Sequence, residues 1–67
     1  MTYTLTAELD GRIEATPIEA PDNTSAMFEA IFKILDRASE NPKGAWAKGE
    51  IKLTDEAGNL VQSMDAQ

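Results

Sequence analysis

The residue types that usually perform acid–base and nucleophilic catalysis are missing from this sequence. It contains no histidine and no cysteine, so the side chain that most often transfers protons at neutral pH is absent. The serine and threonine hydroxyls have no imidazole to activate them, and no thiolate can act as a nucleophile or a metal ligand. Carboxylates remain, but they are spread along expected turns and solvent faces rather than paired. The sequence therefore predicts a protein that is not an enzyme.

Two short polar motifs have structural explanations. Asp55, Glu56 and Asn59 place oxygen ligands in one turn, but the spacing of a calcium-binding loop is absent. We interpret this turn as a polar hairpin tip and predict no metal and no other cofactor. The segment 23–25, Asn-Thr-Ser, matches a glycosylation sequon, and the same residue types are ordinary helix caps, which is the interpretation we adopt.

Charge limits the classes of partner. The chain of 67 residues has 12 acidic and 6 basic residues, a net charge of −6. Nucleic-acid binding and docking on an anionic membrane both need a basic face, so we predict neither. No apolar run approaches the roughly 20 residues that cross a bilayer, and residues 1–4 lack the features of a secretory signal. We expect a cytoplasmic protein.

Length predicts a single domain, residues 1–67, that begins with a hairpin at about 2–19. Tyr3, Leu5 and Ala7 alternate with polar residues, as in a half-buried strand. A three-residue loop at 9–11 would pair Ala7 with Ile13 and separate apolar from polar side chains, so we predict that register. Pro17 predicts that the second strand lies at a sheet edge or bulges.

A helix is predicted at about 24–40, capped by Asn23 or Thr24. Pro42 restricts Asn41 and should end it. The expected core-facing side chains recur at helical spacing. They are Met27, Ile31, Ile34, Leu35 and Ala38.

A second hairpin is predicted at about 46–64, around a turn at 55–59. Two registers remain open, with Leu53 opposite either Val61 or Leu60. The predicted fold is α+β: β-β-α-β-β, an antiparallel sheet of two hairpins with one helix packed on one face. The order of the strands stays open.

Negative charge and two aromatic residues suggest how the chain could bind a partner. Residues 1–22 hold five acids and one base, which would suit a nucleic-acid mimic but also simply keeps a small protein soluble. Phe32 lies off the predicted helix face. If the third strand runs back to Trp46, this side chain lies on the opposite side of the strand from Ile51 and Leu53. Phe32 and Trp46 are therefore candidates for interface anchors. Alternatively, Trp46 closes one end of the core.

The architecture resembles small bacterial domains of unknown function and small phage- or prophage-encoded inhibitors. The similarity rests on the strand ending in Asp10-Gly11, the central helix and the hairpin at 51–61, together with size and acidity. Anti-CRISPR proteins and phage inhibitors of host RNA polymerase belong to this group. The resemblance implies an inhibitor that covers a partner's surface, and it assigns no functional residue.

Two hypotheses follow. The first is a non-enzymatic, acidic binding protein that occupies a basic surface of a larger protein partner, with acids steering the encounter and aromatics anchoring it. The residues expected to take part are Glu8, Glu14, Glu19, Asp22, Phe32 and Trp46. The second is a homodimer that completes a small core by joining edge strands or helix faces.

Overall fold

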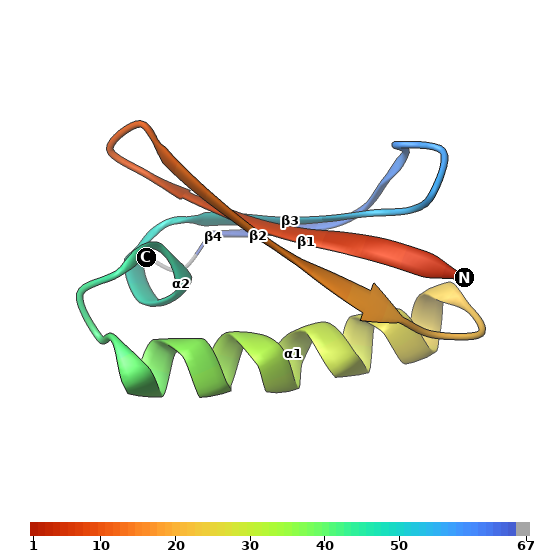
Figure 1. Cartoon of the computed structure of the whole chain (residues 1–67), viewed down its shortest axis with the longest axis horizontal. Coiled ribbons are helices and arrows are strands. Elements are labelled where there is room, and N and C mark those ends of the chain that lie inside the picture. The colour runs from red at the N-terminus through yellow and green to blue at the C-terminus, as the bar shows by residue number, and fades with distance from the viewer. Residues whose placement is uncertain (66–67) are drawn as a thin grey trace.

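A computed structural model of the chain describes residues 1–65. It confirms the α+β fold, with four antiparallel strands in one open sheet and a long helix on one face (Figure 1). A short second helix, which the sequence did not predict, precedes the third strand. The elements are β1 (Thr2–Leu9), β2 (Arg12–Glu19), α1 (Asn23–Glu40), α2 (Ala45–Lys48), β3 (Glu50–Thr54) and β4 (Leu60–Asp65).

The strand order is β2-β1-β3-β4, so β1 and β3 are central and β2 is an edge strand, as Pro17 predicted. Leu5 of β1 pairs with Leu53 of β3, and both are completely buried. The central pair therefore supplies the middle of the core. We call the sheet side that faces α1 the inner face and the opposite side the outer face.

The predicted register of the first hairpin was wrong. Its turn has two residues, Asp10 and Gly11, both in left-handed conformations with φ of 53° and 81°. This geometry matches the twist of the flanking strands, which is why Asp-Gly favours it. Glu8 therefore pairs with Ile13, and Ile13 lies exposed on the outer face. The prediction failed because it assigned Ile13 to the core, a place that Ile18 takes opposite Tyr3.

The second hairpin follows neither of the two registers considered. Leu53 pairs with Gln62, and Thr54 pairs with Leu60, with an irregularity between Leu53 and Thr54. Val61 is the extra residue of this bulge, and it packs against the core. A bulge lets two consecutive residues oppose one partner, so a count of loop residues could not find the pairing. Strand β3 starts at Glu50 rather than near residue 46.

The N-cap of helix α1 lies one residue before Asn23, the earlier of the two predicted caps. Asp22 is the N-cap, and its Oδ1 accepts a hydrogen bond of 2.8 Å from the backbone N–H of Ser25. That hydrogen bond holds the pKa of Asp22 below its ordinary value. At the other end the N–H of Asn41 donates to the carbonyl of Arg37, and the helix stops before Pro42, as predicted.

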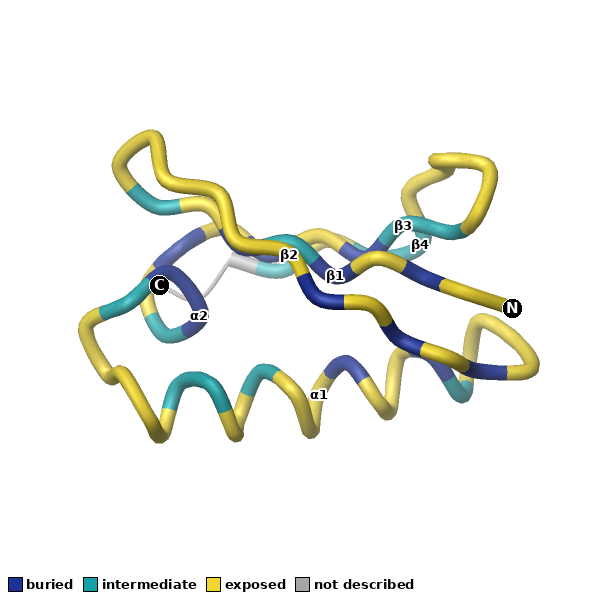
Figure 2. Tube along the Cα trace, in the orientation of Figure 1, coloured by how far each residue is buried: buried dark blue, intermediate teal, exposed yellow. Residues whose placement is uncertain are grey.

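The core is formed by the sheet and by small residues of α1. The largest completely buried side chains are Tyr3, Leu5, Ile51 and Leu53, all from β1 and β3. On α1 only Ala26 and Ala30 are fully buried, and most of the helix surface is exposed (Figure 2). The helix is therefore rotated from the predicted orientation. Ile34 and Ala38 are half-buried, whereas Met27, Ile31 and Leu35 are exposed.

Candidate protein-binding surface

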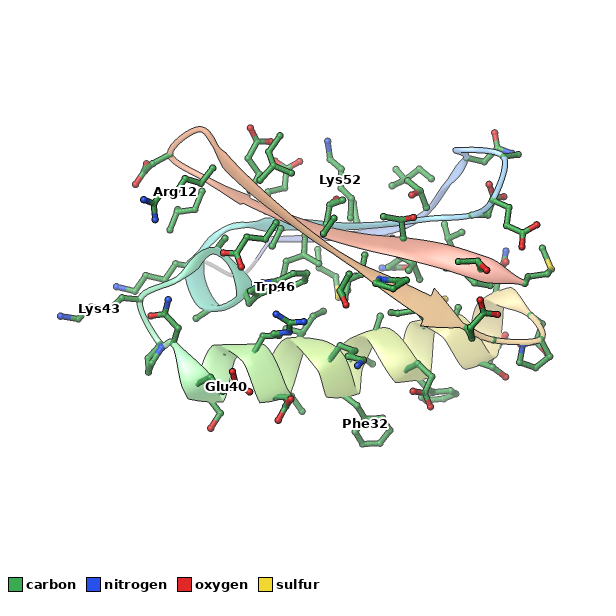
Figure 3. The ribbon with its side chains drawn as sticks, in the orientation of Figure 1. Arg12, Phe32, Glu40, Lys43, Trp46 and Lys52 are labelled. Atoms are coloured by element: carbon green, nitrogen blue, oxygen red, sulfur yellow. The ribbon has the colours of Figure 1, made fainter. Side chains whose placement is uncertain are left out.

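Large apolar side chains lie exposed along one side of α1. Phe32 has 67% of its surface exposed, and it points away from the sheet (Figure 3). Phe28 and Leu35 lie one turn before and one turn after it on the same side. We call this set the α1 apolar face. It consists of Met27, Phe28, Ile31, Phe32 and Leu35.

The α1 apolar face exists because alanines occupy the sheet-facing side of the helix. Five of the eleven buried hydrophobic residues are alanines, and eight large hydrophobics are exposed among the described residues. At about 200 Å² for a large apolar side chain, the exposed fractions correspond to roughly 500 Å² on this face. A contiguous apolar patch of that size on a small protein commonly marks an interaction site.

One border of the α1 apolar face is acidic. Glu29 and Asp36 lie three residues before and four residues after Phe32, so they flank it on neighbouring turns. Both are exposed. The nearby cation Arg37 is directed elsewhere, since its guanidinium lies 5.9 Å from the centre of the Trp46 ring. Lys33 is also exposed and lies one turn from each of these two acids, so this border carries one net negative charge beside apolar surface.

The other border continues into a shallow groove between α1 and the strands β3 and β4. Its volume is about 100 Å³, and its lining is almost entirely apolar. Because one helix is narrower than a four-stranded sheet, α1 leaves this part of the inner face open. The groove is lined by Met27, Ala30, Ile31, Leu53, Gln62 and Met64.

The structure corrects the prediction that Trp46 is a surface anchor. Trp46 belongs to α2, is 4% exposed, and lies between α1 and the sheet (Figure 3). Its Nε1–H donates to Oε1 of Glu14 at 3.2 Å. The parity argument failed because residue 46 is helical rather than part of a strand. Trp46 therefore closes one end of the core, the alternative interpretation of the sequence.

The four acids expected to steer a partner do not lie on one surface. The register directs Glu8 and Glu19 to the outer face. Glu14 lies on the inner face and binds Trp46, and Asp22 caps α1. Sequence reasoning also missed Phe28. Its spacing of four residues from Phe32 and seven from Leu35 could have shown that the three share one side of a helix.

A second cavity, of about 450 Å³, lies between the β1–β2 turn and the loop that joins α1 to α2. Arg12 and Lys43 contribute positive charge to its lining, and Asp10 and Glu14 contribute negative charge. The opposing charges balance, so this cavity shows no electrostatic preference for a cation or an anion.

Among residues 1–64, whose side chains the structure describes, no three acidic side chains come close enough together to hold a metal ion. No helix in this part of the chain combines the length and the apolar character that crossing a membrane requires. Comparison of the chain with protein-family models, curated proteins and solved structures finds no match.

Proposed function

We propose that this protein is a non-enzymatic binding protein that occupies a basic surface of a larger protein partner. The α1 apolar face, with its acidic border, is the observation that carries the proposal. Binding would remove Phe28, Phe32 and Leu35 from water, which is the main favourable term in protein association. A phage-type inhibitor acts in this manner when the surface it covers is one its target needs.

The spacing on α1 indicates what the partner must provide. Phe28, Ile31, Phe32 and Leu35 stand at positions i, i+3, i+4 and i+7, the pattern of a helix that lies in an apolar groove of its partner. Glu29 and Asp36 call for lysine or arginine along one side of that groove. The partner is therefore expected to carry an apolar groove with one basic rim.

The same face is less suited to a second copy in an antiparallel arrangement. If two copies packed through α1 with their helices antiparallel, the two-fold axis would bring the acidic border of one helix against the acidic border of the other. Glu29 and Asp36 of one copy would then face those of the other, and like charges so placed repel. This border therefore favours a foreign, basic partner over self-association through α1.

Affinity capture from cells that express the protein tests the proposal, with variants as baits. Phe28→Ser/Phe32→Ser removes the anchors, and Glu29→Lys/Asp36→Lys reverses the acidic border. Ile13→Ser is the matched control, since Ile13 is 66% exposed but lies on the outer face. We expect a protein that the wild type and the control retain and that both α1 variants lose.

The captured protein is then purified and bound again at rising salt concentrations. Because the acidic border contributes electrostatic attraction, the affinity of the wild type should fall with salt. That of the charge-reversed variant should not. A partner that binds both α1 variants as tightly as the wild type would refute the proposal. So would a chain that recovers no partner and self-associates through α1.

A further inference from the structure

The two edges of the sheet differ in how they are protected against pairing. The β2 edge carries Pro17, which cannot donate a hydrogen bond, and also Arg12, Glu14 and Glu19. Proline and charge are common means of blocking an edge strand. On the β4 edge, residues 60–64 include no proline and no charged residue. The β4 edge therefore has no proline, and its one charged residue, Asp65, stands at the end of the strand.

Charge indicates which strand would pair there. Two copies of a chain with a net charge of −6 repel one another over most of their surfaces. Residues 60–64 and the groove beside them, with Met27 and Ile31, are uncharged. This side is where two copies can approach at the least electrostatic cost. We propose that a second copy of this chain pairs with β4, joining the two sheets into one of eight strands.

The pairing of β3 with β4 restricts the register of such a dimer. Gln62 and Met64 pair with the buried Leu53 and Ile51, so both lie on the inner face, and Ser63 lies on the outer face opposite Lys52. In an antiparallel dimer whose two-fold axis is perpendicular to the sheet, two residues that stand opposite one another must lie on the same face of the joined sheet. Axes through Gln62, Ser63 or Met64 all meet this condition. We place the axis at Ser63, because two copies of its small side chain crowd each other least there, and this register puts Gln62 of one copy opposite Met64 of the other.

The size of the contact predicts a reversible dimer. Strand β4 has six residues, which at about 3.3 Å each span roughly 20 Å. In the direction that stacks α1 on the sheet, which is vertical in Figure 1, the molecule extends 21 Å. The two lengths give a footprint of about 420 Å² per copy, below the roughly 800 Å² per partner of a standard interface and in the range of weak complexes. We therefore expect a monomer at low micromolar concentration and a growing dimer fraction at hundreds of micromolar.

A single cysteine tests the register, because the chain has none of its own. In Ser63→Cys the two thiols meet at the two-fold axis, where opposed Cα atoms lie about 4.5–5.5 Å apart, within reach of a disulfide. Mild oxidation should give a covalent dimer in high yield. Gln62→Cys is the matched control on the same strand, and Ser39→Cys is the control on exposed α1. Both should remain largely monomeric.

Sedimentation of the full chain from 5 to 500 µM, about the range that a weak contact requires, provides the second measurement. Ser63→Lys places two positive charges at the axis and should abolish the dimer, while circular dichroism shows an unchanged fold. A wild type that stays monomeric throughout, with no excess cross-linking of Ser63→Cys, overturns the proposal. A dimer that Ser63→Lys leaves intact also overturns it, as does one that cross-links through Gln62→Cys instead.

Discussion

Replacing Trp46 with alanine should almost abolish folding, although the same change at Phe32 should be mild. Trp46 is 4% exposed, and truncating a buried tryptophan costs about 3–5 kcal/mol. A core in a domain below roughly 70 residues supplies only about 3–5 kcal/mol in total. The Trp46→Ala chain is therefore expected to have a free energy of unfolding near zero at 25 °C.

Urea unfolding followed by far-ultraviolet circular dichroism measures this, since the substitution removes the only tryptophan. Trp46→Phe retains an aromatic ring but loses the hydrogen bond to Glu14, so it should fold with intermediate stability. Phe32→Ala is the control. Only a third of Phe32 is covered, which corresponds to at most about 1.5 kcal/mol. Equal losses at Trp46 and Phe32 would show that our assignment of core and surface is wrong.

Three further changes test other features. A Cβ on Gly49 would overlap the carbonyl oxygen of Glu8. A Cβ on Gly11 would contact no other atom, and alanine there would suffer only the strain of a positive φ. Gly49→Ala should therefore lower the melting temperature more than Gly11→Ala. The pKa of Asp22 is lower in the folded chain than in the unfolded chain, where it is about 3.9. Its carboxylate therefore stabilises the fold at higher pH, and this contribution is lost as the pH falls through the pKa of the folded state. Asp22→Asn should therefore reduce the loss of stability on acidification, measured as the melting temperature from pH 5 to pH 2 (roughly the carboxylate range). Burial raises the pKa of Tyr3, so wild-type stability should fall above about pH 10 and that of Tyr3→Phe should fall less, as alkaline thermal melts would show.

Local sequence patterns were sufficient to predict the four strands and the long helix of this fold. Alternation around Tyr3 and Leu5 predicted β1, and the capping cluster and Pro42 located both ends of α1 to within two residues. Pro17 predicted an edge strand. These features depend on neighbouring residues, which a sequence shows directly.

Features that depend on tertiary packing were not predicted. The apolar residues of α1 cover more than half of the helix circumference, so their periodicity alone could not show which would face the sheet. The alanines Ala26 and Ala30 face it because they let the helix come close. The helical turn around Trp46 has only four residues, too few for a periodic pattern. Phe32 was correctly placed outside the core, and its companion Phe28 was overlooked.

The thin contact between α1 and the sheet affects how the molecule opens. Besides its two buried alanines and the half-buried Ile34, α1 is connected to the sheet by a hydrogen bond of 2.8 Å from the Tyr3 hydroxyl to Oδ1 of Asn23. Segments with little buried apolar area open at lower free energy than the rest of a protein. Amide hydrogens of α1 should consequently exchange with deuterium sooner than those of β1 and β3. Any molecule that covers Phe28 and Phe32 would slow that exchange, so protection of α1 could report occupancy before the occupant is identified.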